Sequence, residues 1–207
     1  MRAVHFDLDG TLVTFDRPYA EILAAACERV LDGRDPAIAE AYTAAFFDRL
    51  RAVEPDPYEA GARAAIDRAG VDADPARFVA VLRETEYAAT VVREGVPALL
   101  DALADGSRPL GVVSNGVGEW QRGKLDAVGL ADRFDAVVTS YDAGAAKPAP
   151  KVFAYAGERL PADEHTMVGD DTEADIEGAR AAGWRAVHVD DGHGLRAGSP
   201  ADLAALL

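Results

Sequence analysis

The 207 residues of this chain suffice for one compact domain with an insertion, or for two small modules, and exclude a large multidomain assembly. Acidic residues outnumber basic ones by 36 to 21, and the resulting net charge of -15 argues against nucleic acid or an anionic membrane as the main partner. Hydrophobic residues make up 49% of the chain, but no apolar run approaches the roughly 20 residues that span a bilayer.

Cysteine usage and the N-terminus predict a cytoplasmic location. Cys27 is the single cysteine, so no internal disulfide can form. The sequence reaches Asp7 before a secretory apolar segment could develop, so we expect no signal peptide. Lysine is scarce relative to arginine, and Asp is the commoner acid, which fits either a halophilic protein or a GC-rich genome.

The first expected element is a buried strand at residues 3–8. This short apolar run ends at the turn residues Asp9-Gly10-Thr11. From about Pro18 to Thr90, alanine-rich stretches carry apolar residues at helical spacing. Breaks at residues 32–33, 54–57, 70 and 74–75 divide this region into four helices without a strand.

Beyond residue 96 the pattern alternates between helices and strands. We expect helices near residues 97–104, 119–128, 150–159 and 173–182, and a short terminal helix from about residue 201. The expected strands are residues 110–113, 136–139, 166–168 and 185–189. Strands that alternate with helices imply a parallel, doubly wound sheet.

The predicted fold class is therefore α/β, with a doubly wound parallel core and an inserted all-helical region. Residues 1–14 and 92–207 would form the core, and residues 15–91 the helical insertion. Ligands of such sheets bind at the carboxyl ends of the strands, near the point where the strand order reverses. Catalytic residues should therefore be sought at the strand ends.

Four strand ends carry unusual polar residues, namely Asp7, Asp9, Ser114, Asn115, Lys147, Asp170, Asp171 and Asp175. Each alone has an ordinary explanation, because Asp and Ser commonly cap helices and Gly-Asp is a common turn. Together they would bring at least three carboxylates, a hydroxyl and a lysine to one edge of the sheet. Like charges repel, so we interpret the cluster as a site for a cation.

These motifs resemble those of the haloacid dehalogenase superfamily of phosphohydrolases in order and interval. Asp7 to Leu12 matches the signature Asp-x-Asp-Gly-Thr-Leu, and residues 168–170 with 175–179 match the fourth motif. The Ser114-Asn115-Gly116 and Lys147-Pro148 elements are weak alone but strong in this context. The resemblance covers the whole predicted core, and it implies that the helical insertion is the movable helical cap of the family.

The resemblance implies a role for each residue. Asp7 would be the nucleophile that forms an aspartyl-phosphate. Asp9 would act as general acid and then as general base, with its pKa raised toward neutrality. Ser114 and the adjacent backbone amides would bind phosphoryl oxygens, and Lys147 would neutralise charge on the phosphoryl group and on Asp7. Asn115 is grouped with these phosphate-binding residues and would shape their loop.

The implied cofactor is Mg²⁺, which prefers oxygen ligands in octahedral geometry. Asp7, the backbone carbonyl of Asp9 and Asp170 would supply the protein ligands, and Asp175 would orient a metal-bound water. Asp171 lies directly beside Asp170, where many relatives have Ser or Thr, and could compete for either role. Of the two, we prefer Asp170.

The leading hypothesis is a magnesium-dependent phosphatase that acts on a small phosphorylated metabolite, as a monomer or homodimer. A 2-haloacid dehalogenase would use the same nucleophile but would need neither Asp9 nor a metal. A phosphotransferase or sugar-phosphate mutase would differ only in the acceptor of the phosphoryl group. A catalytically silent binding module is disfavoured by the complete set of nucleophile, acid, lysine and metal ligands.

A few other residues invite interpretation. His5, His188 and His193 are scattered, and the first two fall in predicted strands, so packing is expected rather than metal binding. Trp184 should pack in the core, and Asp142 could orient Lys147.

Overall fold

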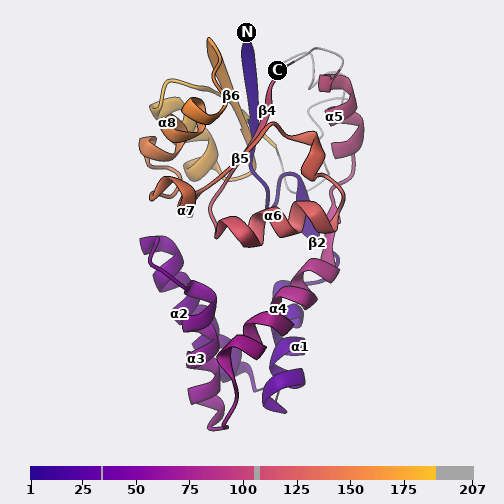
Figure 1. Cartoon of the computed structure of the whole chain (residues 1–207), viewed down its shortest axis with the longest axis vertical. Coiled ribbons are helices and arrows are strands. Elements are labelled where there is room, and N and C mark those ends of the chain that lie inside the picture. Colours follow the sequence, from indigo (N-terminus) through magenta and orange to yellow (C-terminus); the bar gives the residue numbers. More distant parts are fainter. Residues whose placement is uncertain (34, 105–107, 190–207) are drawn as a thin grey trace. The chain divides into compact units, whose positions relative to one another are not determined.

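The computed structural model describes residues 1–33, 35–104 and 108–189, and its chain divides into two compact units (Figure 1). One unit comprises Met1–Thr14 and the chain from Val91 onward, and the other is Phe15–Thr90. The helix expected from residue 201 and His193 lie outside the described residues. Among the helices that are described, none is long and apolar enough to cross a bilayer.

The first unit is built on a five-stranded sheet with the strand order β5-β4-β1-β6-β7. Every neighbouring pair is parallel, which confirms the predicted α/β class. Strand β1 lies at the centre, with β4 and β5 on one side and β6 and β7 on the other. The bounds are Arg2–Phe6 for β1, Leu110–Ser114 for β4, Ala136–Thr139 for β5, Glu164–Gly169 for β6 and Arg185–His188 for β7.

Both faces of the sheet are covered, as the apolar runs of the strands require. On one face, Val4 and Phe6 of β1 belong to an apolar cluster with residues of α5 (Val96–Ala104) and α6 (Gly118–Ala127). The opposite face packs against α8 (Pro150–Arg159) and α9 (Gly178–Ala181). The register aligns Phe6 with Val112 on β4 and with Val168 on β6, so the residues that follow these positions emerge at one edge.

Strand β1 also carries a buried histidine on the face covered by α8. The ring of His5 lies 4.5 Å from that of Trp184, and its Nε2 is 3.1 Å from Nδ1 of His165. Burial, with the neighbouring His165 as a second cause, lowers the pKa of His5 to about 3. His5 is therefore a neutral packing residue at physiological pH.

Some elements differ from the sequence expectation. The helix expected near residues 173–182 begins as a π-helical segment, Thr172–Glu177 (η2), and continues as α9. Two short strands, β2 (Val13–Phe15) and β3 (Thr90–Val92), pair with each other where the chain passes between the units. Three-residue strands are too short to show an alternating pattern. A short helix, α7 (Ser140–Ala143), and a 3₁₀ turn, Ala131–Arg133, were also not expected.

The second unit contains the four expected helices: α1 (Tyr19–Leu31), α2 (Pro36–Ala52), α3 (Pro57–Ala69) and α4 (Pro75–Ala89). Three of them begin at a proline, whose fixed φ suits the first turn of a helix. The side chains of Asp35 and Asp74 cap α2 and α4 by accepting hydrogen bonds from Ala37 N and Ala76 N. Gly70 ends α3 with φ +68°.

Helices α2 and α3 approach closely at Gly61. A Cβ at this position would lie 2.7 Å from Cε2 of Tyr42, whose side chain is fully buried. Tyr42 stacks in turn on Phe46, with ring centroids 5.8 Å apart. Glycine is thus required here by packing, although it is a poor residue for a helix interior.

We expect Gly61→Ala to lower the free energy of unfolding by about 1–2 kcal/mol, because overpacking outweighs the roughly 1 kcal/mol gained in helix propensity. Thermal unfolding followed by circular dichroism measures the change. Gly157→Ala in α8 is the matched control, because its Cβ would meet His165 at an ordinary 3.5 Å. That variant should be neutral or stabilising. Equal midpoints for the two variants would contradict the packing argument.

Candidate active site

The turn after β1 presents two carboxylates in a tightly hydrogen-bonded loop. The amides of Thr11, Leu12 and Val13 all donate to the carbonyl of Leu8. Gly10 has φ +91°, and a Cβ there would overlap Oδ2 of Asp170. Both the backbone conformation and the close approach therefore require glycine. The consequence is that the turn of β1 and the loop after β6 are packed directly together.

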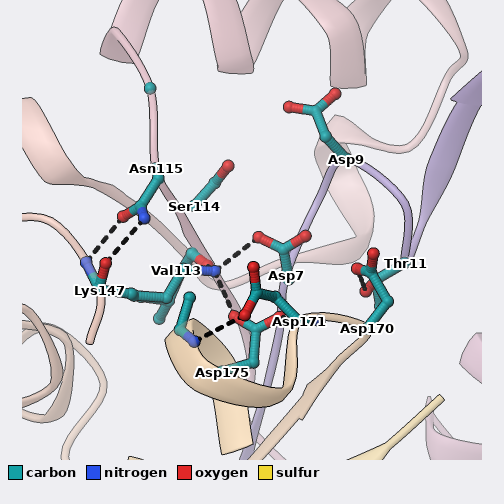
Figure 2. Close-up of polar contacts among 12 residues, drawn as sticks. Asp7, Asp9, Thr11, Val113, Ser114, Asn115, Lys147, Asp170, Asp171 and Asp175 are labelled. Atoms are coloured by element: carbon teal, nitrogen blue, oxygen red, sulfur yellow. Dashed lines mark hydrogen bonds and ion pairs between the residues drawn. The ribbon is translucent and has the colours of Figure 1, made fainter. Parts of the chain in front are cut away.

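Lys147 occupies the centre of the site, where its ammonium group makes three contacts (Figure 2). Nζ lies 2.6 Å from Oδ1 of Asp7, 2.6 Å from Oδ1 of Asp175 and 2.8 Å from the carbonyl of Val113. Burial alone would lower the pKa of Lys147, but the two carboxylates raise it above its ordinary value. The residue is therefore a fixed positive charge with all three donors used.

Asp7 is nearly buried beside this charge. Burial raises the pKa of its carboxyl to about 7; Lys147 opposes the rise, and the charge of Asp175 adds to it. Asp7, Asp170 and Asp175 each have a carboxylate oxygen within 4.8 Å of the others. Lys147 contacts two of these three carboxylates, so the cluster keeps an excess of negative charge. Its all-oxygen donor set is the kind that Mg²⁺ prefers. The residues present thus fit a magnesium ion.

The two neighbouring aspartates of the loop after β6 do different things. Asp170 accepts a hydrogen bond of 2.7 Å from Oγ1 of Thr11 and belongs to the carboxylate cluster. The Asp171 side chain instead caps the π-helical segment, because its Oδ1 accepts from the amides of Glu173 and Ala174 at 2.9 and 2.8 Å. This geometry favours Asp170 over Asp171 as a metal ligand.

Asn115 acts on the backbone of Lys147. Its Nδ2 donates to the Lys147 carbonyl at 3.0 Å, and its Oδ1 accepts from the Lys147 amide at 2.8 Å. Both polar atoms of the amide are occupied in this way, so Asn115 holds the lysine loop against the end of β4. Ser114 differs, because its hydroxyl lies at the cavity that Lys147 and the aspartates line.

Asp9 is held by residues of α6. Its Oδ1 lies 2.8 Å from Nζ of Lys124, and its Oδ2 accepts a hydrogen bond of 2.7 Å from Nε2 of Gln121. Figure 2 shows its carboxylate directed away from Asp7. Burial would raise the pKa of Asp9, but the charge and hydrogen bond of Lys124 hold it below its ordinary value. This direction is opposite to the one expected from the sequence.

Two expectations about neighbouring residues need correction. Asp142 was expected to orient Lys147, but it caps α7 through Thr139 and forms an ion pair of 2.7 Å with Arg122. Asp175 is the residue that holds Lys147. His188 was expected only to pack, yet its Nε2 lies 2.9 Å from the carbonyl oxygen of Asp170 and so supports the loop of the cluster.

Sequence reasoning missed Gln121, Lys124 and Arg93. Arg93, just after β3, donates from a guanidinium nitrogen to the carbonyl of Gly10. Gln121 and Lys124 share the buried face of α6 with Trp120 and Leu125. Polar residues at the apolar positions of an amphipathic helix were the signal that could have identified them.

The site residues surround a cavity of about 190 Å³ at the carboxyl ends of β1, β4 and β6, which is room for a phosphoryl-sized group. It is lined by Asp7, Asp9, Ser114, Asn115, Lys147, Asp170, Asp171, Ala174 and Asp175. Five carboxylates, a fixed cation and a hydroxyl-bearing residue therefore line one small polar space. This set of groups can form and hydrolyse an acyl-phosphate.

Comparison with known proteins finds similar hydrolases. A sequence model for haloacid dehalogenase-like hydrolases matches residues 1–183. The phosphoglycolate phosphatase of Aquifex aeolicus is 30% identical over 197 residues, which cover 89% of this chain and 83% of the relative. The phosphoserine phosphatase of Thermus thermophilus is 43% identical over 93 residues, but the matched region spans 44% of this chain and only 36% of that relative.

One solved structure with the same fold is that of a dehalogenase and not of a phosphatase. The 2-haloacid dehalogenase of Pseudomonas syringae pv. Tomato aligns over 100% of this chain and 97% of its own with a TM-score of 0.75. Its sequence identity is 24%, so this likeness concerns the fold alone.

Proposed function

The chain belongs to the haloacid dehalogenase-like hydrolase family, and on that premise we propose that it is a magnesium-dependent phosphatase that hydrolyses a small phosphomonoester through an aspartyl-phosphate. The observation that carries the proposal is the contact of Lys147 with Asp7 and Asp175, next to the carboxylate cluster of Asp7, Asp170 and Asp175. The phosphatases among the relatives support the same reaction.

The first step is a displacement at phosphorus. A carboxylate oxygen of Asp7 forms a bond to phosphorus while the bond between phosphorus and the alcohol oxygen breaks. Lys147 keeps the Asp7 carboxylate oriented and offsets charge on the phosphoryl oxygens. The hydroxyl of Ser114 donates to one of these oxygens. Asp9 takes up a proton from solvent when the phosphoryl group binds and gives it to the departing alcohol, so that the leaving group is neutral.

The second step releases phosphate. The Asp9 carboxylate now removes a proton from a water molecule, which attacks phosphorus, and the bond to Asp7 breaks. Lys124 favours the ionised form of Asp9 in the resting site. The negative charge of a bound phosphoryl group acts in the opposite direction and raises the pKa of Asp9. Asp9 is thus protonated when it acts as the acid and ionised when it acts as the base.

The magnesium ion would be held by Asp7, the backbone carbonyl of Asp9 and Asp170, with Asp175 orienting a bound water. When bound, the ion supplies positive charge that stabilises the phosphoryl oxygens. The protein residues fit such an ion because three carboxylates have oxygens within 4.8 Å of one another.

The magnesium assignment predicts different effects for two adjacent residues. Asp170→Asn should weaken Mg²⁺ binding about 10-fold or more, because it replaces a carboxylate of the cluster. Asp171→Asn should change it little, because Asn caps a helix about as well as Asp. Isothermal titration calorimetry of each purified variant with MgCl₂ measures both values. A larger loss for Asp171→Asn would reverse the assignment of the two residues.

The main alternative is 2-haloacid dehalogenation, in which a carboxylate attacks carbon. We disfavour it, because a halide leaves without a proton and such a reaction has no use for Asp9 or for a cation site. Phosphotransfer to a sugar hydroxyl needs the same residues as hydrolysis. The proposed partner is a small phosphorylated metabolite, the proposed location is the cytoplasm, and the single cysteine, Cys27, fits a reducing compartment.

A panel of phosphomonoesters with and without Mg²⁺ tests the proposal by measuring release of inorganic phosphate. Sugar phosphates, phosphoglycolate, phosphoserine and nucleotides should be included, together with 2-chloropropionate assayed for chloride. We expect phosphate release that depends on Mg²⁺ and no chloride release. Chloride release without metal would favour the dehalogenase, and a phosphorylated acceptor would favour a phosphotransferase.

A further inference from the structure

Helix α6 points two buried polar side chains toward the turn that carries Asp9. Gln121 and Lys124 are 2% and 5% exposed, on the same face as Trp120 and Leu125. Residues three apart on a helix are neighbours on its surface. The pair therefore reaches the Asp9 carboxylate from one side, and each residue takes one of its oxygens.

The amide of Gln121 connects two residues of the site. Nε2 lies 2.7 Å from Oδ2 of Asp9 and 2.7 Å from Oγ of Ser114. An amide nitrogen has two protons, and a carboxylate only accepts, so one proton goes to Asp9 and the other to Ser114. The hydroxyl of Ser114 is then an acceptor toward α6. Its own proton is left for an acceptor in the cavity that Ser114 lines.

Lys124 is an unfavourable residue for packing alone. Its side chain is 6% exposed, whereas that of its partner Asp9 is 40% exposed and remains in contact with solvent. The ammonium group of Lys124 loses its water here, and a buried ion pair is often no more stabilising than apolar residues of similar volume. A methionine would fill the same place in α6 without this cost. Lys124 is therefore better explained by what it does to Asp9.

We propose that Gln121 and Lys124 are positioning residues: together they fix the orientation of the Asp9 carboxylate, and Gln121 also directs the Ser114 hydroxyl toward the phosphoryl group. The inference rests on the proposed phosphatase function and extends it to a second layer of residues on α6. Neither residue is among those that line the cavity. Both act through groups that do, and small displacements of such groups are costly, about 100-fold in rate for about 1 Å.

The test compares Lys124→Met, Gln121→Leu and the control Asp126→Asn, an exposed charge on the same helix. Both positioning variants should lower kcat about 10- to 100-fold. Gln121→Leu should also raise the inhibition constant for orthophosphate about 2- to 10-fold, because the Ser114 hydroxyl is no longer directed toward the bound phosphate. Lys124→Met should leave that constant near the wild-type value, and Asp126→Asn should change neither quantity.

A double-mutant cycle separates positioning from general damage. Lys124→Met is combined with Asp9→Ala, and turnover of an alkyl phosphate is measured, because hydrolysis of this ester depends most on Asp9. If Lys124 acts through Asp9, the lysine substitution should cost less than about twofold in the background that lacks the carboxylate. Lys124→Gln, which keeps a polar side chain, takes the place of Lys124→Met if that variant does not fold.

The outcomes distinguish this inference from the proposed function. Full additivity in the cycle, or variants that keep wild-type kcat, overturns the positioning role while leaving the phosphatase assignment intact. A wild-type protein that releases phosphate from none of the panel overturns both.

Discussion

Asp7→Asn is expected to abolish phosphate release, by about four orders of magnitude or more, while the fold is retained. Asn is nearly the same shape as Asp, but its amide cannot form the acyl-phosphate. The substitution also removes one carboxylate from the cluster with Asp170 and Asp175. Release of inorganic phosphate from the best substrate of the panel measures the loss.

The fold should tolerate this change for a reason specific to the site. Burial raises the pKa of Asp7 to about 7, so keeping its carboxylate charged near neutral pH lowers the stability of the folded protein. A neutral side chain removes this cost, and Lys147 keeps Asp175 and the Val113 carbonyl as partners. The thermal midpoint should therefore stay the same or rise.

The matched control for this variant is Asp171→Asn, the same chemical change at a residue that caps a helix in the same site. It should keep most of the activity. Phosphatases of the expression host are the main source of error, so mock-purified extract sets the background. Turnover by Asp7→Asn clearly above that background would remove Asp7 from the role of nucleophile.

The proximity of the candidate site residues could be predicted because parallel strands end at one edge of a sheet. Asp7 follows β1 and Asp170 follows β6, and the register aligns Phe6 with Val168 just before them. The apolar runs identified these strands, so the convergence of the carboxylates followed from the chain order alone. The helical insertion could be predicted equally well, because its prolines and capping aspartates mark where the helices begin.

The orientation of Asp9 could not be predicted, since it depends on how α6 packs. Its contacts with Gln121 and Lys124 join residues 112 and 115 positions apart, and no local pattern encodes such a contact. The direction of its pKa shift depends on the same contact. Likewise, Asp170 and Asp171 are distinguished by contacts seen in the structure: Asp170 lies in the carboxylate cluster, and Asp171 accepts from the amides of the next turn.

The second large effect is expected for Asp9→Ala, and it should depend on the leaving group. An alkyl alcohol leaves as a strong base unless it is protonated, so kcat/KM toward an alkyl phosphate should fall about 100- to 10,000-fold. A nitrophenolate is a weak base and needs less help, so the loss on p-nitrophenyl phosphate should be much smaller. The value of kcat/KM reports the steps up to transfer of the phosphoryl group to Asp7. It therefore isolates the acid role of Asp9 from its later role as base.

Asp9→Asn is the matched variant that separates proton transfer from packing. Its amide oxygen can still accept from Lys124, so the side chain stays bound to α6 through that contact. Pairing of its amide nitrogen with Gln121 would require the Gln121 amide to rotate and release Ser114. The variant cannot give up a proton to the alcohol. If Asp9 is the general acid, Asp9→Asn and Asp9→Ala should lose activity to a similar extent on the alkyl ester, and both should recover with the activated ester. Equal losses on both esters would exclude the acid role, because a residue needed only for structure or for binding does not discriminate between leaving groups.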